Sequence, residues 1–174
     1  MLPQFAYARP ETLEEAVKLL SEPGAVVHAG GSDLLGCIRD RIFPVDQIVS
    51  ISAVKDLRGI YEASDGTIRI GALTTITELA ESALVRRKLP GLAKGAAEVA
   101  SPQLRNQGTI GGNLCQKPRC WYYRGEFHCL RKGGEKCFAI SGENQFHAIF
   151  GHDDICAITH PSDTAPPLAA LNAS

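Results

Sequence analysis

A glycine turn that leads directly into a cysteine-rich stretch constrains this chain more than any other feature. Gly108-Thr-Ile-Gly-Gly-Asn113 opens the stretch, and five of the six cysteines follow it. These are Cys115, Cys120, Cys129, Cys137 and Cys156. A turn of this kind can hold an anionic cofactor, and clustered thiols can hold a metal centre. We therefore expect two neighbouring cofactors between which electrons move.

The cysteine spacing, C-x4-C-x8-C-x7-C-x18-C, favours an iron–sulfur cluster and leaves zinc as the alternative. It contains no CxxC pair, which counts against zinc ribbons, zinc fingers and ferredoxin-type runs. Four thiolates from widely spaced loop positions can bind a four-iron cube. Zinc stays open because four histidines offer nitrogen ligands. They are His128, His147, His152 and His160. The sixth cysteine, Cys37, falls in a predicted helix and is expected to be a small buried hydrophobe.

The composition indicates an ordinary globular chain. With 174 residues, 44% hydrophobic and 21% charged, it can bury a core in one domain or two small lobes. A net charge of −1 gives no electrostatic support for binding nucleic acid or an anionic membrane. We find no secretory signal and no window near the roughly 18 apolar residues of a membrane span. The default expectation is therefore a cytoplasmic protein, in which a disulfide framework is disfavoured.

The first part of the chain reads as a small α/β lobe ending near residue 55. Residues 10–20 are predicted to be helical, with Thr12 and Glu15 at capping-box spacing. A short strand at 25–29, a helix at 34–42 and a strand at 47–51 complete this lobe.

The remainder mixes strands and helices. Runs at 59–63 and 67–72 flank Ser64-Asp65-Gly66, which indicates a hairpin. Helices are predicted at 75–82, 92–100 and 164–171, the last capped by Ser162-Asp163. The 107–156 stretch has no clear period and is expected to be a long irregular loop.

A second glycine turn, Ala29-Gly-Gly-Ser-Asp-Leu34, lies between a predicted strand and a predicted helix. Its N–H groups and the helix N-terminus suit a phosphate. It matches neither the GxGxxG nor the GxxxxGK[ST] pattern, so it can equally be a tight turn with Ser32 or Asp33 as the N-cap. Together with the turn at Thr109–Asn113 it could grip the two ends of one pyrophosphate.

These motifs make the chain resemble the FAD-binding medium subunit of molybdenum hydroxylases, the xanthine dehydrogenase and carbon monoxide dehydrogenase group. The matching stretches are Pro10–Ala16, Ala29–Leu34, Thr109–Asn113 and Ser162–Pro166, in the family order. The resemblance implies that FAD is bound by Ala29, Gly30, Gly31, Ser32, Asp33, Leu34, Thr109, Ile110, Gly111, Gly112, Asn113, Ser162 and Asp163.

Most family members join the Gly-Gly-Asn and Ser-Asp motifs by a few residues, whereas here residues 114–161 intervene. This insertion resembles that of the 4-hydroxybenzoyl-CoA reductase β subunit and, more closely, that of aldehyde oxidoreductase FAD subunits of the PaoABC type. In those subunits it carries an extra [4Fe–4S] cluster. By this resemblance the metal ligands are Cys120, Cys129, Cys137 and Cys156, and Cys115 is spare. The family's flavin domain continues past Leu171, so the chain is expected to be a fragment.

The resemblance implies an α+β, two-lobed PCMH-type FAD-binding domain, truncated at the C-terminus, with an iron–sulfur loop insertion at 114–161. Lobes at 1–55 and 56–174 would hold FAD between them. Electrons would pass from molybdopterin on a large partner, through [2Fe–2S] clusters on a small partner, to FAD here and on to an external acceptor. The missing C-terminal half is a further expected partner, and a twin-arginine partner would allow periplasmic export. The alternative function is a non-catalytic, zinc-stabilised interaction module without flavin.

Overall fold

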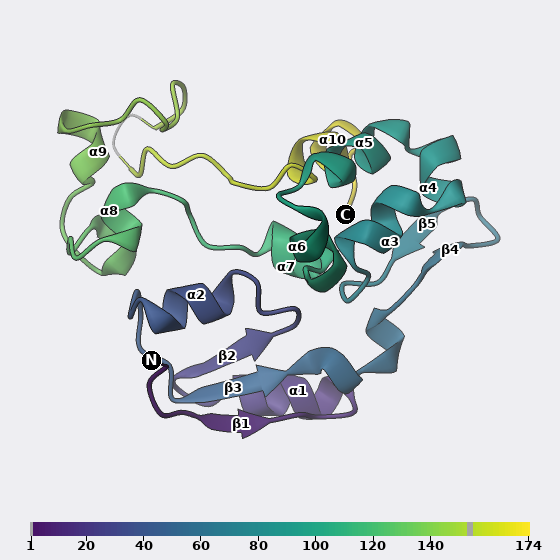
Figure 1. The fold of residues 1–174 in the computed structure, drawn as a ribbon, viewed down its shortest axis with the longest axis horizontal. Coiled ribbons are helices and arrows are strands. Elements are labelled where there is room, and N and C mark those ends of the chain that lie inside the picture. Colours follow the sequence, from purple (N-terminus) through teal and green to yellow (C-terminus); the bar gives the residue numbers. More distant parts are fainter. Residues whose placement is uncertain (1, 153–154) are drawn as a thin grey trace.

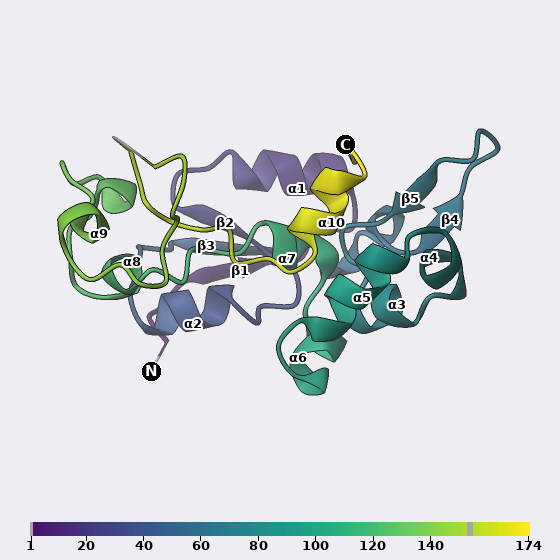
Figure 2. The same cartoon turned by 90° about the horizontal axis from the view of Figure 1, so that it is seen from above.

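The computed structural model describes residues 2–152 and 155–174, and it opens with a parallel sheet between two helices (Figure 1). Strands β1 (Ala6–Ala8) and β2 (Ala25–His28) both pair with the central strand β3 (Gln47–Ser50). Helices α1 (Leu13–Leu20) and α2 (Leu34–Arg39) lie on opposite faces of this sheet (Figure 2). We call residues 6–50 the sheet module.

The predicted helix, strand, turn, helix and strand of the sheet module are confirmed, but β1 was not predicted. The side chain of Thr12 accepts a hydrogen bond from the Glu15 N–H at 3.2 Å, so the cap of α1 forms as expected. Strand β1 has three residues, and its pairing partner begins at Gln47. A strand this short shows too little alternation of apolar and polar side chains to be recognised in the sequence, and its stability depends on pairing with the distant β3.

A hairpin and a group of helices follow the sheet module. Two 3-10 turns, η1 (Ile51–Ala53) and η2 (Lys55–Leu57), lead into the antiparallel pair β4 (Ile60–Glu62) and β5 (Ile68–Ile70), as the sequence predicts. The next elements are α3 (Ile76–Glu81), α4 (Ala83–Lys88), α5 (Pro90–Glu98) and α6 (Pro102–Gln107). Thr75 and Glu78 form the full capping box at the start of α3.

These helices bury the larger of the hydrophobic cores. Its central side chains are Ile76, Leu79, Val85, Leu92, Ala96 and Ile110. The last helix, α10 (Ala165–Ala170), packs against α5. Its N-cap residue is Thr164, without a side-chain capping bond, and of the predicted cap residues Ser162 accepts a hydrogen bond from the Ala165 N–H at 3.2 Å. We call β4 to α7 together with α10 the helical module.

The expectation of an irregular loop over 107–156 is wrong for several short segments. Helix α7 (Ile110–Leu114) contains the Gly-Gly pair, and the insertion holds α8 (Trp121–Arg124), η3 (Leu130–Lys132) and α9 (Phe138–Ser141). Glycine lowers helix propensity, which hides α7 in the sequence. Tertiary hydrogen bonds compensate, because the Ile110 and Gly111 N–H groups donate to Thr74 and Ala72 carbonyls at 2.9 and 3.0 Å.

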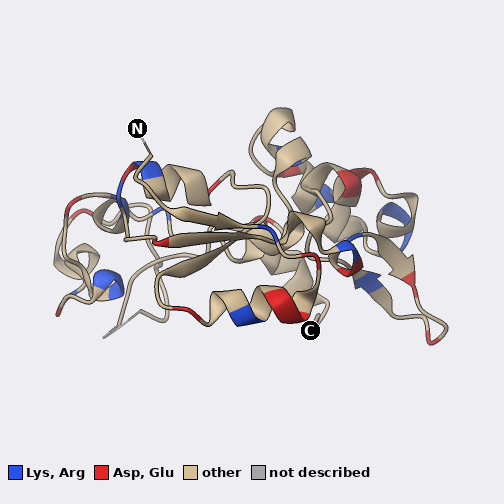
Figure 3. Ribbon diagram, turned by 90° about the horizontal axis from the view of Figure 1, so that it is seen from below, with Lys and Arg blue, Asp and Glu red and all other residues tan. Residues whose placement is uncertain are grey.

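The insertion runs out beside α2, away from the helical module, and returns to α7 (Figure 1). Acidic and basic residues are interspersed over both modules (Figure 3). Within residues 2–152 and 155–174, every helix is too short or too polar to cross a bilayer.

Candidate functional site

The two glycine turns meet backbone to backbone. The Gln107 side chain donates a hydrogen bond to the Gly30 carbonyl at 3.1 Å. A Cβ atom at Gly30 would lie 2.0 Å from the Gln107 carbonyl oxygen and 3.2 Å from the Gly108 Cα. Glycine is therefore required at position 30 by this contact. The next residue, Gly31, has φ +74°, a conformation that also favours glycine.

A cavity of about 200 Å³ opens where the turns meet. All three predicted FAD-binding segments contribute to its wall. Their contributing residues are Ser32, Asp33, Thr109, Gly112, Asn113 and Asp163. The other lining residues are Gly108, which opens the second glycine turn, and seven that the motifs did not identify: Ile76, Val99, Ala100, Leu104, Gln116, Arg119 and Pro161. These seven come from the start of α3, the end of α5, α6 and both ends of the insertion, and no sequence signal places them at the cavity. Ala100 has φ +43°, so a strained backbone position lies in this wall.

The remaining predicted FAD-binding residues do not line the cavity; they are Ala29, Gly30, Gly31, Leu34, Ile110, Gly111 and Ser162. Ile110 is 5% exposed and belongs to the helical core. The second turn is also internally hydrogen-bonded, because the Gly112 N–H donates to Thr109 Oγ1 at 3.1 Å and the Asn113 N–H to the Thr109 carbonyl at 2.8 Å. This turn therefore faces the cavity mainly through the side chains of Thr109 and Asn113 and the surface of Gly112.

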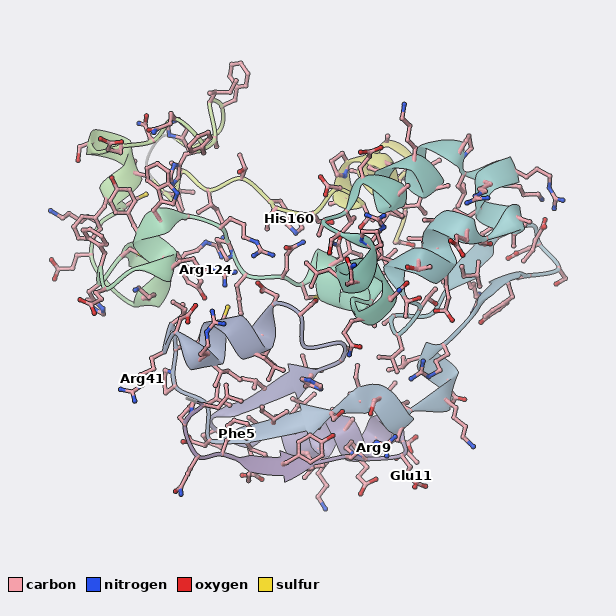
Figure 4. All side chains as sticks on the ribbon, viewed as in Figure 1. Phe5, Arg9, Glu11, Arg41, Arg124 and His160 are labelled. Carbon is pink, nitrogen blue, oxygen red and sulfur yellow. The ribbon has the colours of Figure 1, made fainter. Side chains whose placement is uncertain are left out.

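Asn113 joins the two ends of the insertion. Its Oδ1 accepts hydrogen bonds from Ser162 Oγ at 2.5 Å and from Thr164 Oγ1 at 2.8 Å. Ser162 is buried and directed toward Asn113. His160 lies at the same junction (Figure 4), with its Nε2 2.9 Å from the Leu114 carbonyl. Two of the predicted FAD-binding residues, Asn113 and Ser162, thus bind each other.

Asp33 connects the first glycine turn to the insertion. Its carboxylate accepts hydrogen bonds from Arg124 Nη2 and from the Lys117 N–H, both at 2.8 Å. The side chain makes no capping hydrogen bond at the start of α2. Arg124 lies between α2 and α8 (Figure 4) and also donates to the Pro118 carbonyl at 2.7 Å. The ion pair therefore attaches the start of the insertion to the sheet module.

Cys37 is fully buried, as expected for a small hydrophobe. Arg124 Nη1 lies 2.8 Å from its sulfur. Burial raises the pKa of the Cys37 thiol, and the Asp33 carboxylate raises this pKa further, whereas Arg124 acts in the opposite direction. The thiol is therefore held protonated at neutral pH, and we assign Cys37 a packing role.

The four predicted cysteine ligands border one small cavity in the insertion. Its lining residues are Cys120, Tyr122, Tyr123, Cys129, Leu130, Arg131, Cys137, Phe138, Cys156 and Ile158. Cys115 is exposed and does not line it. The free space is about 10 Å³, so the side chains close in around its centre. The donor set is purely thiol, in aromatic and aliphatic surroundings, which suits iron–sulfur chemistry.

In the described part of the chain, no three His, Cys, Asp or Glu side chains converge tightly enough to hold one metal ion. A single zinc would bring its sulfurs to about 3.8 Å from one another, given zinc–sulfur bonds of about 2.3 Å. A cube of four irons and four sulfides is larger and separates its thiolates more widely. Four thiols that border one cavity without converging on a single point are therefore compatible with a four-iron cluster.

The cysteine-bearing turns are defined by local hydrogen bonds. The Cys129 carbonyl accepts from the Lys132 and Gly134 N–H groups at 2.8 and 3.0 Å, and Gly133 adopts φ +87°. His147 Nε2 lies 3.2 Å from the Cys120 sulfur. The sequence offers this histidine as an alternative zinc ligand or, taken alone, as a surface residue or a residue that supports a ligand, and its contact with Cys120 depends on a fold that spacing does not reveal.

The chain matches the family described as "FAD binding domain in molybdopterin dehydrogenase" over residues 3–174. It is 36% identical over 172 residues to the aldehyde oxidoreductase FAD-binding subunit PaoB of Escherichia coli strain K12, covering 97% of this chain and 54% of PaoB. Identity to the carbon monoxide dehydrogenase medium chain of Hydrogenophaga pseudoflava is 40% over 114 residues, covering 64% of this chain and 39% of that protein. A solved carbon monoxide dehydrogenase structure from the same organism matches with a TM-score of 0.63 at 39% identity, covering 66% of this chain and 40% of that one.

The extents of these matches differ in an informative way. An alignment over 97% of the chain necessarily includes most of the insertion, whereas one over 64% leaves out about a third of the chain. The chain spans about half the length of PaoB. The family match leaves out only the first two residues. The chain therefore belongs to the family of FAD-binding domains of molybdopterin dehydrogenases.

Proposed function

We propose that this chain carries FAD and a [4Fe–4S] cluster in the electron-transfer subunit of a molybdenum-dependent oxidoreductase, of the aldehyde oxidoreductase or xanthine dehydrogenase kind. The observation that carries the proposal is the pair of neighbouring sites. Three family motifs border one cavity, and four cysteines of the insertion border the other. Family membership supports flavin binding and weighs against the alternative, a zinc-stabilised module without flavin.

The proposed FAD site comprises the motif residues that line the cavity and the remaining residues of the same three motifs, which adjoin them in the sequence. Its polar wall combines hydroxyl and amide side chains with the guanidinium of Arg119 and the carboxylates of Asp33 and Asp163. The hydroxyl, amide and guanidinium groups suit a phosphate-bearing ligand, and the Asp33 carboxylate already accepts a hydrogen bond from Arg124. The cavity of about 200 Å³ is smaller than the roughly 300–1,000 Å³ usual for cofactor sites, so it would hold part of the dinucleotide. FAD, when bound, supplies the chemistry of accepting and passing on electrons.

The fold is proposed to be of the PCMH type, with lobes at 1–55 and 56–174 and the insertion at 114–161. The proposed partners are a large molybdopterin subunit, a small [2Fe–2S] subunit and the C-terminal half of this family's fold. The relatives' names support this division of labour, since PaoB is an FAD-binding subunit and its Hydrogenophaga counterpart a medium chain. This chain would place cofactors and tune them, and it would hold no substrate-oxidising residue.

Cofactor content of the purified protein tests the proposal directly. We expect flavin absorbance together with about four irons and four sulfides per chain, as a single cubic cluster requires. Flavin would be measured after acid release, and iron and sulfide by colorimetric assay. A colourless protein with one zinc and no flavin would contradict the proposal in favour of the interaction module.

Exchanging one proposed cluster ligand should separate the two cofactors. We expect Cys129→Ser to lose most of its iron and keep its FAD, because Cys129 is 6% exposed beside the thiol cavity and is remote in sequence from the flavin motifs. Cys115→Ser is the matched control and should retain iron, since Cys115 is exposed and outside the cavity. Full iron retention in Cys129→Ser would show that the ligand set is wrong.

A further inference from the structure

We infer that His147 is a positioning residue for the cluster, whose Nε2–H group donates a hydrogen bond to the Cys120 sulfur and thereby raises the reduction potential of the cluster. This inference rests on the proposed [4Fe–4S] site, which the four cysteines would form. It concerns a residue that is not one of the proposed ligands. His147 Nε2 lies 3.2 Å from Cys120 Sγ.

The proton on the ring can be assigned from the chemistry of the partner. A ligating cysteine is a thiolate, which accepts hydrogen bonds and cannot donate one. His147 must therefore carry a proton on Nε2 for this contact to be a hydrogen bond. Its other nitrogen, Nδ1, is buried and has no hydrogen-bond partner among the described residues. A buried nitrogen without a partner costs free energy, so its presence calls for a role that offsets this cost.

The fold holds the imidazole firmly against the sulfur. The His147 N–H donates to the Asn144 carbonyl at 2.9 Å, and the Asn144 side chain donates to the Ala139 carbonyl at 3.0 Å. The neighbouring Phe146 ring packs edge-on against Trp121, with centroids 5.7 Å apart. Since Trp121 begins α8 directly after Cys120, the same contact fixes the histidine over the ligand. The Asn144 hydrogen bonds and the contact between Phe146 and Trp121 therefore both hold His147 beside the Cys120 sulfur.

The direction of the effect follows from charge. Reduction adds an electron to a cluster that is shared with its thiolate ligands. A hydrogen bond to a thiolate stabilises negative charge, so it stabilises the reduced cluster more than the oxidised one and raises the potential. Removal of the donor should lower the potential. The flavin potential should stay unchanged, because the hydrogen bond and the ring contact of His147 are to Cys120 and Tyr122, neither of which lines the flavin cavity.

The test is a redox titration of the intact complex, followed by electron paramagnetic resonance of the cluster. We expect His147→Leu to shift the cluster to a lower potential and His147→Gln, which keeps an N–H donor, to return it toward the wild-type value. His128→Leu is the control, because His128 is exposed, and it should leave the potential unchanged.

The iron content and the potential of the His147 variants give further outcomes that either support or overturn the role of this residue. If His147→Leu and His147→Met lose iron while His147→Gln keeps it, the donor is required for cluster retention and the inference stands. An unchanged potential in His147→Leu, or loss of iron from all three variants, overturns it while the proposed function survives. A wild-type complex without any four-iron cluster instead overturns the proposed function, and the inference with it.

Discussion

Replacing Gly30 with alanine is expected to abolish tight FAD binding and to destabilise the chain. The added Cβ would lie 2.0 Å from the Gln107 carbonyl oxygen, which is backbone and cannot rotate away. The two glycine turns would have to separate, and the cavity wall that they share would open. Overpacking of this kind costs about 1–3 kcal/mol or more of the free energy of unfolding. We expect FAD affinity to fall at least about tenfold, since a loss of 1.4 kcal/mol in binding already has that effect.

Gly36 provides the matched control for this substitution. It lies within α2, near the same turn, and a Cβ there would meet nothing within 4 Å. Gly36→Ala should leave FAD binding unchanged and stabilise the chain by up to about 1 kcal/mol through helix propensity. Urea unfolding and FAD titration of both variants make the comparison. Equal behaviour of Gly30→Ala and Gly36→Ala would rule out the contact between the turns as a determinant of the site.

Replacing Arg124 with alanine is the second large effect that we expect. Arg124 and Asp33 are 23% and 16% exposed in their side chains, so the ion pair is only partly solvated. Its removal leaves the Asp33 carboxylate with one fewer charged partner at the edge of the flavin cavity, and leaves the Pro118 carbonyl without its donor. We expect a loss of about 2–3 kcal/mol in the free energy of unfolding, below the value for a fully buried pair. FAD should also bind more weakly, because Asp33 loses its anchor.

Arg39 supplies the control for the arginine substitution. It pairs with Asp40 at 2.8 Å, but the two side chains are 64% and 49% exposed. Arg39→Ala should therefore leave the free energy of unfolding nearly unchanged. Arg124→Lys should not restore stability, because one ammonium group cannot reproduce the guanidinium contacts to Asp33, Pro118 and Cys37. A loss in Arg124→Ala no larger than in Arg39→Ala would disprove the anchoring role.

The parts of the fold that the sequence predicts are those with local signals. The capping residues Thr12 and Thr75 and the turn residues Asp65-Gly66 act within a few positions of themselves, and the elements they bound are present. Strand β1 and helix α7 escaped prediction because their stability comes from distant partners. The first needs β3, and the second needs the Ala72 and Thr74 carbonyls.

The same distinction applies to the candidate site. The glycine, Ser-Asp and cysteine motifs are readable because each residue type has a special chemistry. By contrast, Arg119 and Arg124 stand among several basic residues around the cysteines, and nothing in the sequence places them at the flavin cavity. Their positions beside Asp33 and on the cavity wall arise only when the insertion folds back onto α2. Long-range contacts of this kind leave no trace in spacing or periodicity.

The hydrogen bond between Asn113 and Ser162 bears on how such a chain can acquire its insertion. The residues that flank the insertion are 2.5 Å apart at their side-chain oxygens. A segment that leaves and re-enters a fold at one point can be inserted or deleted without displacing the rest of the fold. Relatives that align over only about two thirds of this chain are compatible with a flavin domain that lacks the insertion. Evolution can thus add a whole insertion to a flavin domain at a single junction, and the ion pair of Asp33 with Arg124 then attaches the insertion to α2.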